Sequence, residues 1–201
     1  MTHETLETQA EAGEVGRAKR LKRATHSTHE RLDQAIMARE PFADRERYGR
    51  FLAVQHRFHA EIDPLFGHPE LQALLPDLEE RRRLDLIRQD MADLGMASPT
   101  LTPGRAEPLP GIAVALGWLY VAEGSNLGAA FLLKEAAKLG LSQAFGARHL
   151  APAPEGRGLH WRTFTAALDA VALPEADEAR VVAGAEQAFR RVHALVGDVF
   201  G

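Results

Sequence analysis

The order of apolar and polar residues along the chain is helical almost throughout. From Arg17 onward, apolar side chains such as Leu32 and Ile36 recur at the three- to four-residue period of an amphipathic α-helix, and the same period returns in later segments. Pro41 ends the first segment, and Asp44 can cap the second. The pattern predicts helices over residues 17–37, 44–66, 70–75, 78–94, 112–138, 159–171 and 175–200.

Turn-rich segments separate some of these helices. Residues 95–111 ("GMASPTLTPGRAEPLPG") and 146–158 ("GARHLAPAPEGRG") are rich in Gly and Pro, which is typical of surface connections. The chain contains no internal repeat, low-complexity tract or domain linker. We therefore expect one all-α domain over residues 17–201. Residues 1–16 are acidic and lack the apolar core of a signal peptide, so we expect a flexible leader.

Composition agrees with this fold class and excludes several functions. Ala, Leu, Arg and Glu are abundant and favour helices, whereas aromatic residues make up only 6% of the 201 residues. A formal charge of −4 argues against a general nucleic-acid surface. The chain has no cysteine, and no apolar stretch approaches the roughly 18 residues of a membrane span. We expect a cytoplasmic protein that binds neither nucleic acid nor membranes.

The histidines of the first helix raise the question of a metal. The Glu-x-x-His pairs of di-iron bundles and the His-Glu-x-x-His pattern of zinc enzymes are absent. His26 shares its side of the helix with charged residues, so we expect it in solvent. His29 neighbours Thr25 and Leu32 on an apolar stripe, where a histidine is more often a hydrogen-bonded core residue than a metal ligand. Both interpretations of His29 stay open.

The position of Lys22 bears on whether His29 is a core residue or a metal ligand. It lies seven residues earlier on nearly the same face, about 10 Å away along the helix axis. That separation is similar to the distance between the iron of a heme and its propionates. A neutral imidazole on the iron and an ammonium group on the carboxylates could hold a heme by its edge. A solvated surface lysine explains Lys22 equally well.

Three glycines mark the helix predicted over residues 112–138. Gly117, Gly124 and Gly128 lie at i, i+7 and i+11, and each costs about 1 kcal/mol relative to alanine inside a helix. A bare stripe permits close approach of another helix or of a flat ligand. The spacing alone favours helix packing. Ser125 and Asn126 lie between the glycines and could satisfy carbonyl groups that a bend sets free.

Four segments together resemble the bacterial heme oxygenases: "AKRLKRATHSTHERLD", "FLAVQHRFHAEID", "GWLYVAEGSNLGAAFL" and "GARHLAPAPEGRGLHWRTF". The resemblance runs from Arg17 to the C-terminus and is greatest to the enzymes with which pathogenic bacteria acquire iron from host heme. Its most specific part is the Gly-Ser-Asn-Leu-Gly segment together with the upstream histidine. It implies a monomeric, all-α fold that sandwiches heme between a proximal and a distal helix.

The resemblance also implies a reaction and a set of site residues. Heme b would be substrate and cofactor at once, and O2 with reductant would convert it to biliverdin, carbon monoxide and Fe2+. The implied site comprises the proximal iron ligand His29, the distal segment Gly124, Ser125, Asn126 and Gly128, the propionate contacts Lys22 and Tyr120, and a buried network of Gln55, His59 and Arg83 that holds ordered water.

Some points of this resemblance stay open. His59 and Arg83 could instead form a structural hydrogen-bonded pair, and for Arg148 and His149 the resemblance implies no secure role beyond pinning a loop. Lys22 and Tyr120 together imply the heme seating that leads to cleavage at the α-meso carbon. A heme-binding or storage protein of the same fold without turnover, and a helical binding module without heme, remain the alternatives.

Electrons have to come from another protein, because no Gly-x-Gly-x-x-Gly motif for a flavin or nicotinamide is present. We expect a ferredoxin or an NAD(P)H-dependent reductase. The basic residues near the expected heme edge could dock such a partner or could simply form a solvated helix face. They are Arg17, Lys19, Arg20, Lys22 and Arg23.

Overall fold

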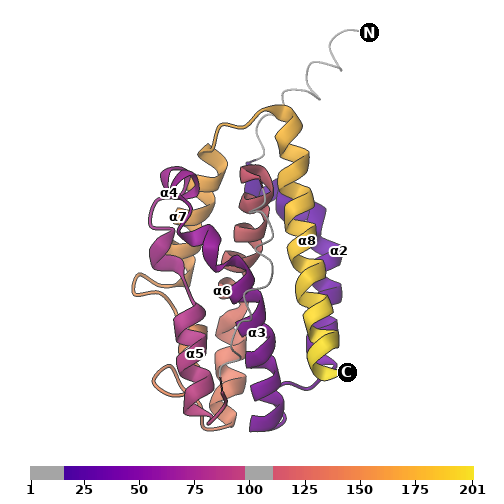
Figure 1. The fold of residues 1–201 in the computed structure, drawn as a ribbon, viewed down its shortest axis with the longest axis vertical. Helices are drawn as coiled ribbons and strands as arrows, with labels where there is room; N and C mark the ends of the chain where they lie inside the picture. Colours follow the sequence, from indigo (N-terminus) through magenta and orange to yellow (C-terminus); the bar gives the residue numbers. More distant parts are fainter. Residues whose placement is uncertain (1–15, 98–110) are drawn as a thin grey trace.

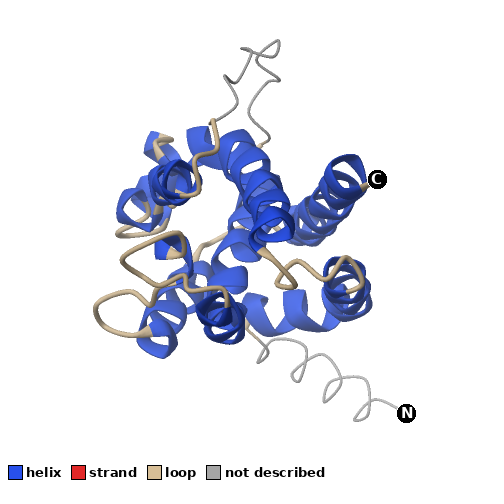
Figure 2. Cartoon of the chain, turned by 90° about the horizontal axis from the view of Figure 1, so that it is seen from below, coloured by secondary structure: helices blue, strands red, loops and turns tan. Residues whose placement is uncertain are grey.

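The computed structural model describes residues 16–97 and 111–201, and these residues form helices and no strand (Figures 1 and 2). Most of the helices run along the long axis of the molecule (Figure 1). They are α2 (Arg17–Met37), α3 (Arg45–Phe66), α4 (Pro69–Leu74), η1 (Glu79–Arg81), α5 (Leu84–Asp93), α6 (Ile112–Lys138), η2 (Arg148–Leu150), α7 (Arg157–Ala170) and α8 (Glu175–Phe200), where η marks a 3-10 helix.

The predicted all-α class is confirmed, and the long helices begin and end as predicted. α2, α6 and α8 match the expected ranges 17–37, 112–138 and 175–200. Asp44 caps α3 as expected, because its side chain accepts a hydrogen bond from the backbone N–H of Arg47 at 2.8 Å. None of the helices in residues 16–97 and 111–201 combines the length and apolar character that crossing a membrane requires.

One predicted helix, over residues 78–94, is wrong. The structure has the short η1, a break at Arg82 and Arg83, and then α5. Arg82 is extended, with φ −58° and ψ 136°. The break follows from tertiary contacts, because the side chain of Arg81 is almost fully buried in ion pairs with Asp77 and Glu123. Helix propensity alone does not register such contacts.

The centre of the fold is the crossing of α6 and α8, which pack against each other more extensively than any other pair (Figure 1). Glycines lie at the crossing on both helices. A Cβ added at Gly117 would lie 2.2 Å from the carbonyl oxygen of Val181, and one at Gly184 would lie 2.3 Å from that of Val114. The two backbones therefore approach as closely as glycine permits.

Helix α2 is fastened to α8 and α7, and it packs little against α6 (Figure 1). Its anchor is Arg17, which is 5% exposed. The guanidinium donates to the backbone carbonyls of Leu168 and Val171 and forms an ion pair with Glu178 at 2.6 Å. These contacts fix the start of α2 against α7 and α8.

The two remaining predictions on chain organisation concern segments that are mostly outside the described residues. The expected leader covers residues 1–16, of which 1–15 are not described. The expected surface connection covers residues 95–111, of which 98–110 are not described.

Candidate functional site

The three glycines of α6 have two different environments. Gly117 is buried against α8, as the spacing favoured, but Gly124 and Gly128 are not helix-packing positions. A Cβ at Gly128 would meet nothing within 4 Å, and one at Gly124 would meet only the Trp161 ring, at 3.6 Å. Leu127 and Phe131, one turn apart on the same helix, are 45% and 53% exposed. This bare and apolar side of α6 is suited to a flat apolar ligand.

Helix α6 continues through its glycines, and nearby polar groups bond to its carbonyls. The Ser125 hydroxyl donates to the carbonyl oxygen of Ala122 at 2.7 Å, within the unbroken helix. Asn126 is buried, and both its carbonyl oxygen and its side-chain Oδ1 accept hydrogen bonds from Arg157, at 2.9 Å each. The glycine segment is therefore held from the side by α7.

His29 lies on α2 with its side chain 55% exposed. The interpretation of His29 as a hydrogen-bonded core residue is therefore wrong. Its ring meets the edge of Phe189 on α8, with 5.5 Å between the ring centroids. Nδ1 lies 3.3 Å from Oδ2 of Asp33, whose carboxylate favours a proton on Nδ1 and leaves the lone pair on Nε2. Such an imidazole fits the axial position of a heme iron.

The expected propionate contacts differ in their surroundings. Lys22 is exposed on α2, as His29 is. Tyr120 is 8% exposed on α6, and its ring tilts against Trp161 at a centroid distance of 5.6 Å. Burial raises the pKa of the Tyr120 phenol, so the hydroxyl remains a neutral hydrogen-bond donor. Both residues are chemically suited to carboxylates, one by charge and the other by hydrogen bonding.

Directly beside the glycine segment is a cavity of about 40 Å³, enough for about three water molecules. Helices α3, α6 and η2 surround it together with Arg83, the residue before α5, and no carboxylate is among the described residues that line it. The three residues predicted to hold ordered water are brought together here. The polar lining residues are Gln55, His59, Arg83, Ser125, Asn126 and His149.

The lining groups are mainly neutral, and Arg83 carries the one lasting charge among them. Burial lowers the pKa of His59 to about 3, with Arg83 and His149 adding to the effect, so its imidazole is neutral at pH 7. Arg83 donates to the carbonyl oxygen of His149 at 2.5 Å, and no hydrogen bond joins Arg83 to His59 among the residues described. The alternative of a His59–Arg83 structural pair is therefore not what the structure contains.

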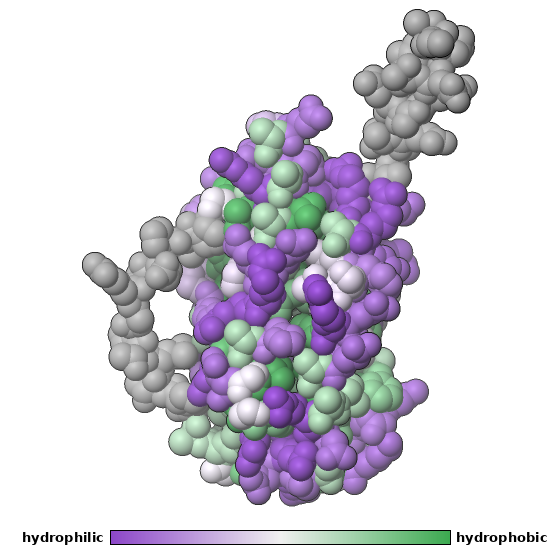
Figure 3. All heavy atoms as spheres, turned by 90° about the vertical axis from the view of Figure 1, so that its right-hand side faces the viewer, coloured by the Kyte–Doolittle hydropathy of each residue, from purple (hydrophilic) through white to green (hydrophobic). Residues whose placement is uncertain are grey.

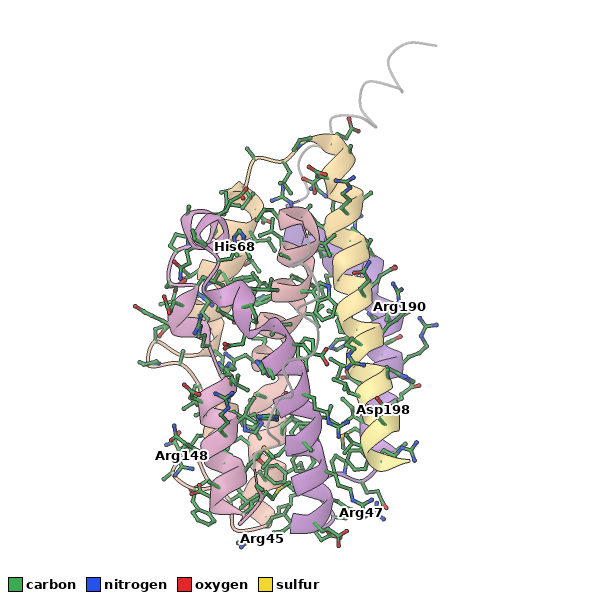
Figure 4. The ribbon with its side chains drawn as sticks, viewed as in Figure 1. Arg45, Arg47, His68, Arg148, Arg190 and Asp198 are labelled. Atoms are coloured by element: carbon green, nitrogen blue, oxygen red, sulfur yellow. The ribbon has the colours of Figure 1, made fainter. Side chains whose placement is uncertain are left out.

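The sequence did not reveal the role of Asp90. This fully buried carboxylate accepts from the backbone N–H groups of Arg148 and His149 and lies 2.8 Å from Nδ1 of His149. Arg148 also pairs with Asp93 and lies along the α5 side of the molecule (Figure 4). These contacts agree with a loop-pinning role for Arg148 and His149, which stays a prediction. Nε2 of His149 is buried and has no hydrogen-bond partner among the described residues, and His149 lines the cavity, so a water there would find a hydrogen-bonding site.

A second polar cluster, which the sequence also did not reveal, includes Glu123, the residue before Gly124. Arg81 forms an ion pair with Glu123 at 2.7 Å, and both side chains are at least 98% buried. His160 lies 3.4 Å from Glu123 and 2.7 Å from Glu155. Hydrogen bonds to Glu123 and Glu155 raise the pKa of His160. Paired acids and bases spread over three segments left no local signal in the sequence.

The basic cluster of α2 is smaller than the sequence implied. Arg17 is buried and Arg20 pairs with Glu178 at 2.9 Å, so neither extends freely from the helix. Lys19, Lys22 and Arg23 are exposed, and so is His26, as expected. The face that carries α2 and α8 is largely hydrophilic (Figure 3).

Comparison with known proteins shows the family of this chain. The family model described as heme oxygenase matches residues 16–198. The chain is 43% identical over 171 residues to the heme oxygenase PigA of Pseudomonas aeruginosa, covering 85% of this chain and 86% of that protein. A heme oxygenase of Xanthomonas campestris pv. campestris is 29% identical over 153 residues, covering 75% of this chain and 88% of that protein.

Solved structures agree as well. The heme oxygenase of Neisseria meningitidis, solved with NO and CO bound to it, superposes with a TM-score of 0.88 at 42% identity and covers 93% of both chains. The heme oxygenase of Leptospira interrogans, at 16% identity, has a TM-score of 0.73 over 92% of this chain and all of that one, and it supports the fold alone. By the family model that matches almost the whole chain, and by its identity to these relatives, this chain belongs to the heme oxygenase family.

Proposed function

We propose that this heme oxygenase binds its substrate between α2 and α6, with Nε2 of His29 on the iron and the Gly124–Gly128 backbone over the opposite face. The observation that carries the proposal is the open position at Gly128, where an added Cβ meets nothing within 4 Å, whereas one at Gly117 on the same helix would clash with α8. Leu127 and Phe131 offer apolar contact to the macrocycle. His29, exposed beside Asp33, offers the ligand.

A heme fits these residues because the α2 side offers one imidazole ligand and the α6 side offers open backbone. One axial ligand suffices for heme iron, and the residues described hold no group of three His, Asp or Glu side chains arranged for a separate metal ion. The glycine side offers backbone and no coordinating side chain, so a heme held there would leave room for O2 on that face. The heme supplies the iron that activates O2 and the ring that is opened to biliverdin, carbon monoxide and Fe2+.

The cavity gives the protein a way to move protons to this position. Gln55, the neutral His59 and Arg83 can hold water beside Ser125 and Asn126, which border the glycine segment. No carboxylate is among the described residues of this lining, so we expect water, and not a strong acid, to be the group nearest to the reacting oxygen. We propose that the water chain ends at Nε2 of His149, whose Nδ1 is held by Asp90.

The choice of meso carbon is part of the proposal. Lys22 on α2 and Tyr120 on α6 would hold the two propionates and so fix the rotation of the ring in its plane. We expect α-biliverdin. Chromatography of the product isomers tests this, and a mainly β or δ product would overturn the assignment. Lys22→Met, which removes the ammonium group and keeps the length, is expected to broaden the isomer distribution, whereas Lys19→Met on the same helix is the matched control.

The electron donor is proposed to be a ferredoxin or an NAD(P)H-dependent reductase with an acidic surface. Lys19, Lys22 and Arg23 form the exposed remainder of the basic cluster on α2. Contacts between exposed charges weaken as salt rises, so the rate of reduction should fall with ionic strength. Lys19→Glu should slow reduction by such a partner while leaving reduction by a small chemical reductant unchanged. If Lys19→Glu were reduced as fast as the wild type in both assays, docking at this place would be contradicted.

The experiment that tests the function is incubation of the purified protein with hemin, O2 and reductant. Loss of the Soret band with growth of biliverdin absorption is the expected result, and a stable Soret band would indicate heme binding without turnover. His29→Ala should change the ferric heme spectrum and largely stop turnover. His26→Ala, one turn away and also exposed, is the control. Undiminished turnover in His29→Ala would falsify the ligand assignment.

A further inference from the structure

Arg157 occupies an unusual position for a charged residue. It is the first residue of α7, and its guanidinium reaches back to α6 and to the end of η2. Nη1 donates to both the backbone oxygen and Oδ1 of Asn126, and Nη2 donates to the backbone oxygen of Leu150. Within the described part of the chain it has no carboxylate partner. The hydrogen bonds given for its guanidinium therefore all go to carbonyl and amide oxygens.

The orientation of the Asn126 amide follows from this contact. A guanidinium has five N–H donors and no acceptor, so the amide atom that faces it has to be the oxygen. The amide nitrogen of Asn126 is then left for other partners. Asn126 also lines the cavity beside the glycines, so we infer that this amide nitrogen donates on that side.

The glycine segment needs such support from outside. Gly124 and Gly128 have no side chains to fix the helix, and the space over Gly128 is open. Asn126 lies midway between them and is 4% exposed. An arginine fork that grips one residue by backbone and side chain together restricts both the position and the rotation of that residue.

We propose that Arg157 is a positioning residue of the distal site, holding Asn126 so that the glycine backbone keeps its place over the heme and the Asn126 amide donates into the water cavity. This inference rests on the proposed heme position between α2 and α6. It gives Arg157 no contact with substrate, and its effect passes through Asn126 alone.

The central test compares Arg157→Met with Arg162→Met, a matched change at an exposed arginine of the same helix. Three quantities are measured: the side-chain amide resonance of Asn126 in the heme-free protein, the pH midpoint of the visible spectrum of the ferric heme complex, and the rate of biliverdin formation. Arg157→Met should move the resonance and the midpoint and slow turnover roughly 10- to 100-fold, the scale of a displaced reacting group. Arg162→Met should change none of them.

Two further variants keep the test decisive. Arg157→Lys retains the charge, but one ammonium group cannot serve Asn126 and Leu150 together, so a slowed rate is expected and wild-type values in all three measurements would overturn the proposal. In an Asn126→Ala background, Arg157→Met should add little further loss, because the effect passes through that residue. Fully additive losses would show that Arg157 acts elsewhere.

The outcomes also separate this inference from the proposed function. If Arg157→Met lowers only the unfolding temperature, with resonance, midpoint and turnover as in the wild type, Arg157 is a structural strap and the proposal fails. If the wild-type protein itself forms no biliverdin, the proposed function fails. The Asn126 resonance and the ferric spectrum, neither of which requires turnover, would then still decide the role of Arg157.

Discussion

Alanine substitutions at the three glycines of α6 should have opposite effects on stability. In a helix interior, glycine is about 0.8–1.0 kcal/mol less favourable than alanine. The open position at Gly128 adds no steric term, so Gly128→Ala should stabilise the heme-free protein by about 1 kcal/mol. For a chain of this length that raises the unfolding temperature by about 2–4 °C. Gly124→Ala, with only Trp161 at 3.6 Å, should behave in the same way.

Gly117→Ala should instead destabilise the protein. The new Cβ would lie 2.2 Å from the carbonyl oxygen of Val181 and 2.5 Å from the backbone nitrogen of Ala185, so α8 itself would have to shift. Overpacking of this kind costs roughly 3 kcal/mol, at the upper end of the usual range. After the gain in helix propensity a net loss of about 2 kcal/mol remains, which lowers the unfolding temperature by roughly 4–8 °C.

At the glycines of the site, the alanine substitution that stabilises the protein should weaken heme binding. The methyl group of Gly128→Ala projects into the space assigned to the macrocycle, and a clash there costs about 1–3 kcal/mol, or roughly a 5- to 150-fold loss of hemin affinity. Thermal unfolding of the heme-free variants and hemin titration measure the two effects separately. A Gly128→Ala protein that is stabilised but binds and cleaves hemin normally would refute the placement of the substrate. A Gly117→Ala protein of wild-type stability would refute the helix crossing.

Three further predictions concern the buried charges. Asp90→Asn should destabilise the protein by about 1–3 kcal/mol, since the amide cannot accept all the hydrogen bonds that His149 and Arg148 donate to the carboxylate. Urea unfolding measures the loss, and Asp85→Asn on the exposed side of α5 is the control. Burial would raise the pKa of Asp90, but these hydrogen bonds outweigh it and lower the pKa, so the stability from Asp90 is present above about pH 4 and lost as the pH falls through the folded-state value. Hydrogen bonds to Glu123 and Glu155 raise the pKa of His160, so its contribution to the free energy of unfolding is full below about pH 6.5 and lost as the pH rises through the folded-state value. His160→Gln should flatten this part of the profile of stability against pH, and an unchanged profile would contradict the assignment. Glu178→Gln should weaken the hold on the buried Arg17 and cost about 1–3 kcal/mol, read by thermal unfolding, whereas Glu175→Gln at the exposed start of α8 should be neutral.

The helices could be predicted because their signals are local. α2, α6 and α8 each show a continuous apolar period bounded by Gly or Pro, and their ends follow from those residues. The break before α5 could not be predicted in this way. Two arginines, both good helix formers, lie at it, and what interrupts the helix is an ion pair between Arg81 and Glu123, 42 residues apart. Contacts over such separations leave no periodicity.

The candidate site was predicted in its residue types more fully than in its geometry. The resemblance to heme oxygenases pointed to His29, the glycine segment and the polar network, and the structure brings Gln55, His59 and Arg83 to one cavity. His29 was expected on a mainly apolar stripe, whereas it is more than half exposed and contacts α8 only through the edge of Phe189. Asp90 and Arg157 were not identified, since each acts on a residue far along the chain.

The glycines of α6 show why spacing alone could not separate packing from binding. Gly117 and Gly124 lie seven residues apart, about 10 Å along the axis, and so they face nearly the same side of one helix. Helix α8 crosses α6 at Gly117 and has diverged before Gly124, where Trp161 is the nearest side chain. The same bare backbone therefore serves close packing at one end and an open face at the other. It follows that stability and heme binding can be altered independently within this helix, and that a stabilised variant at Gly124 or Gly128 is expected to be a poorer enzyme.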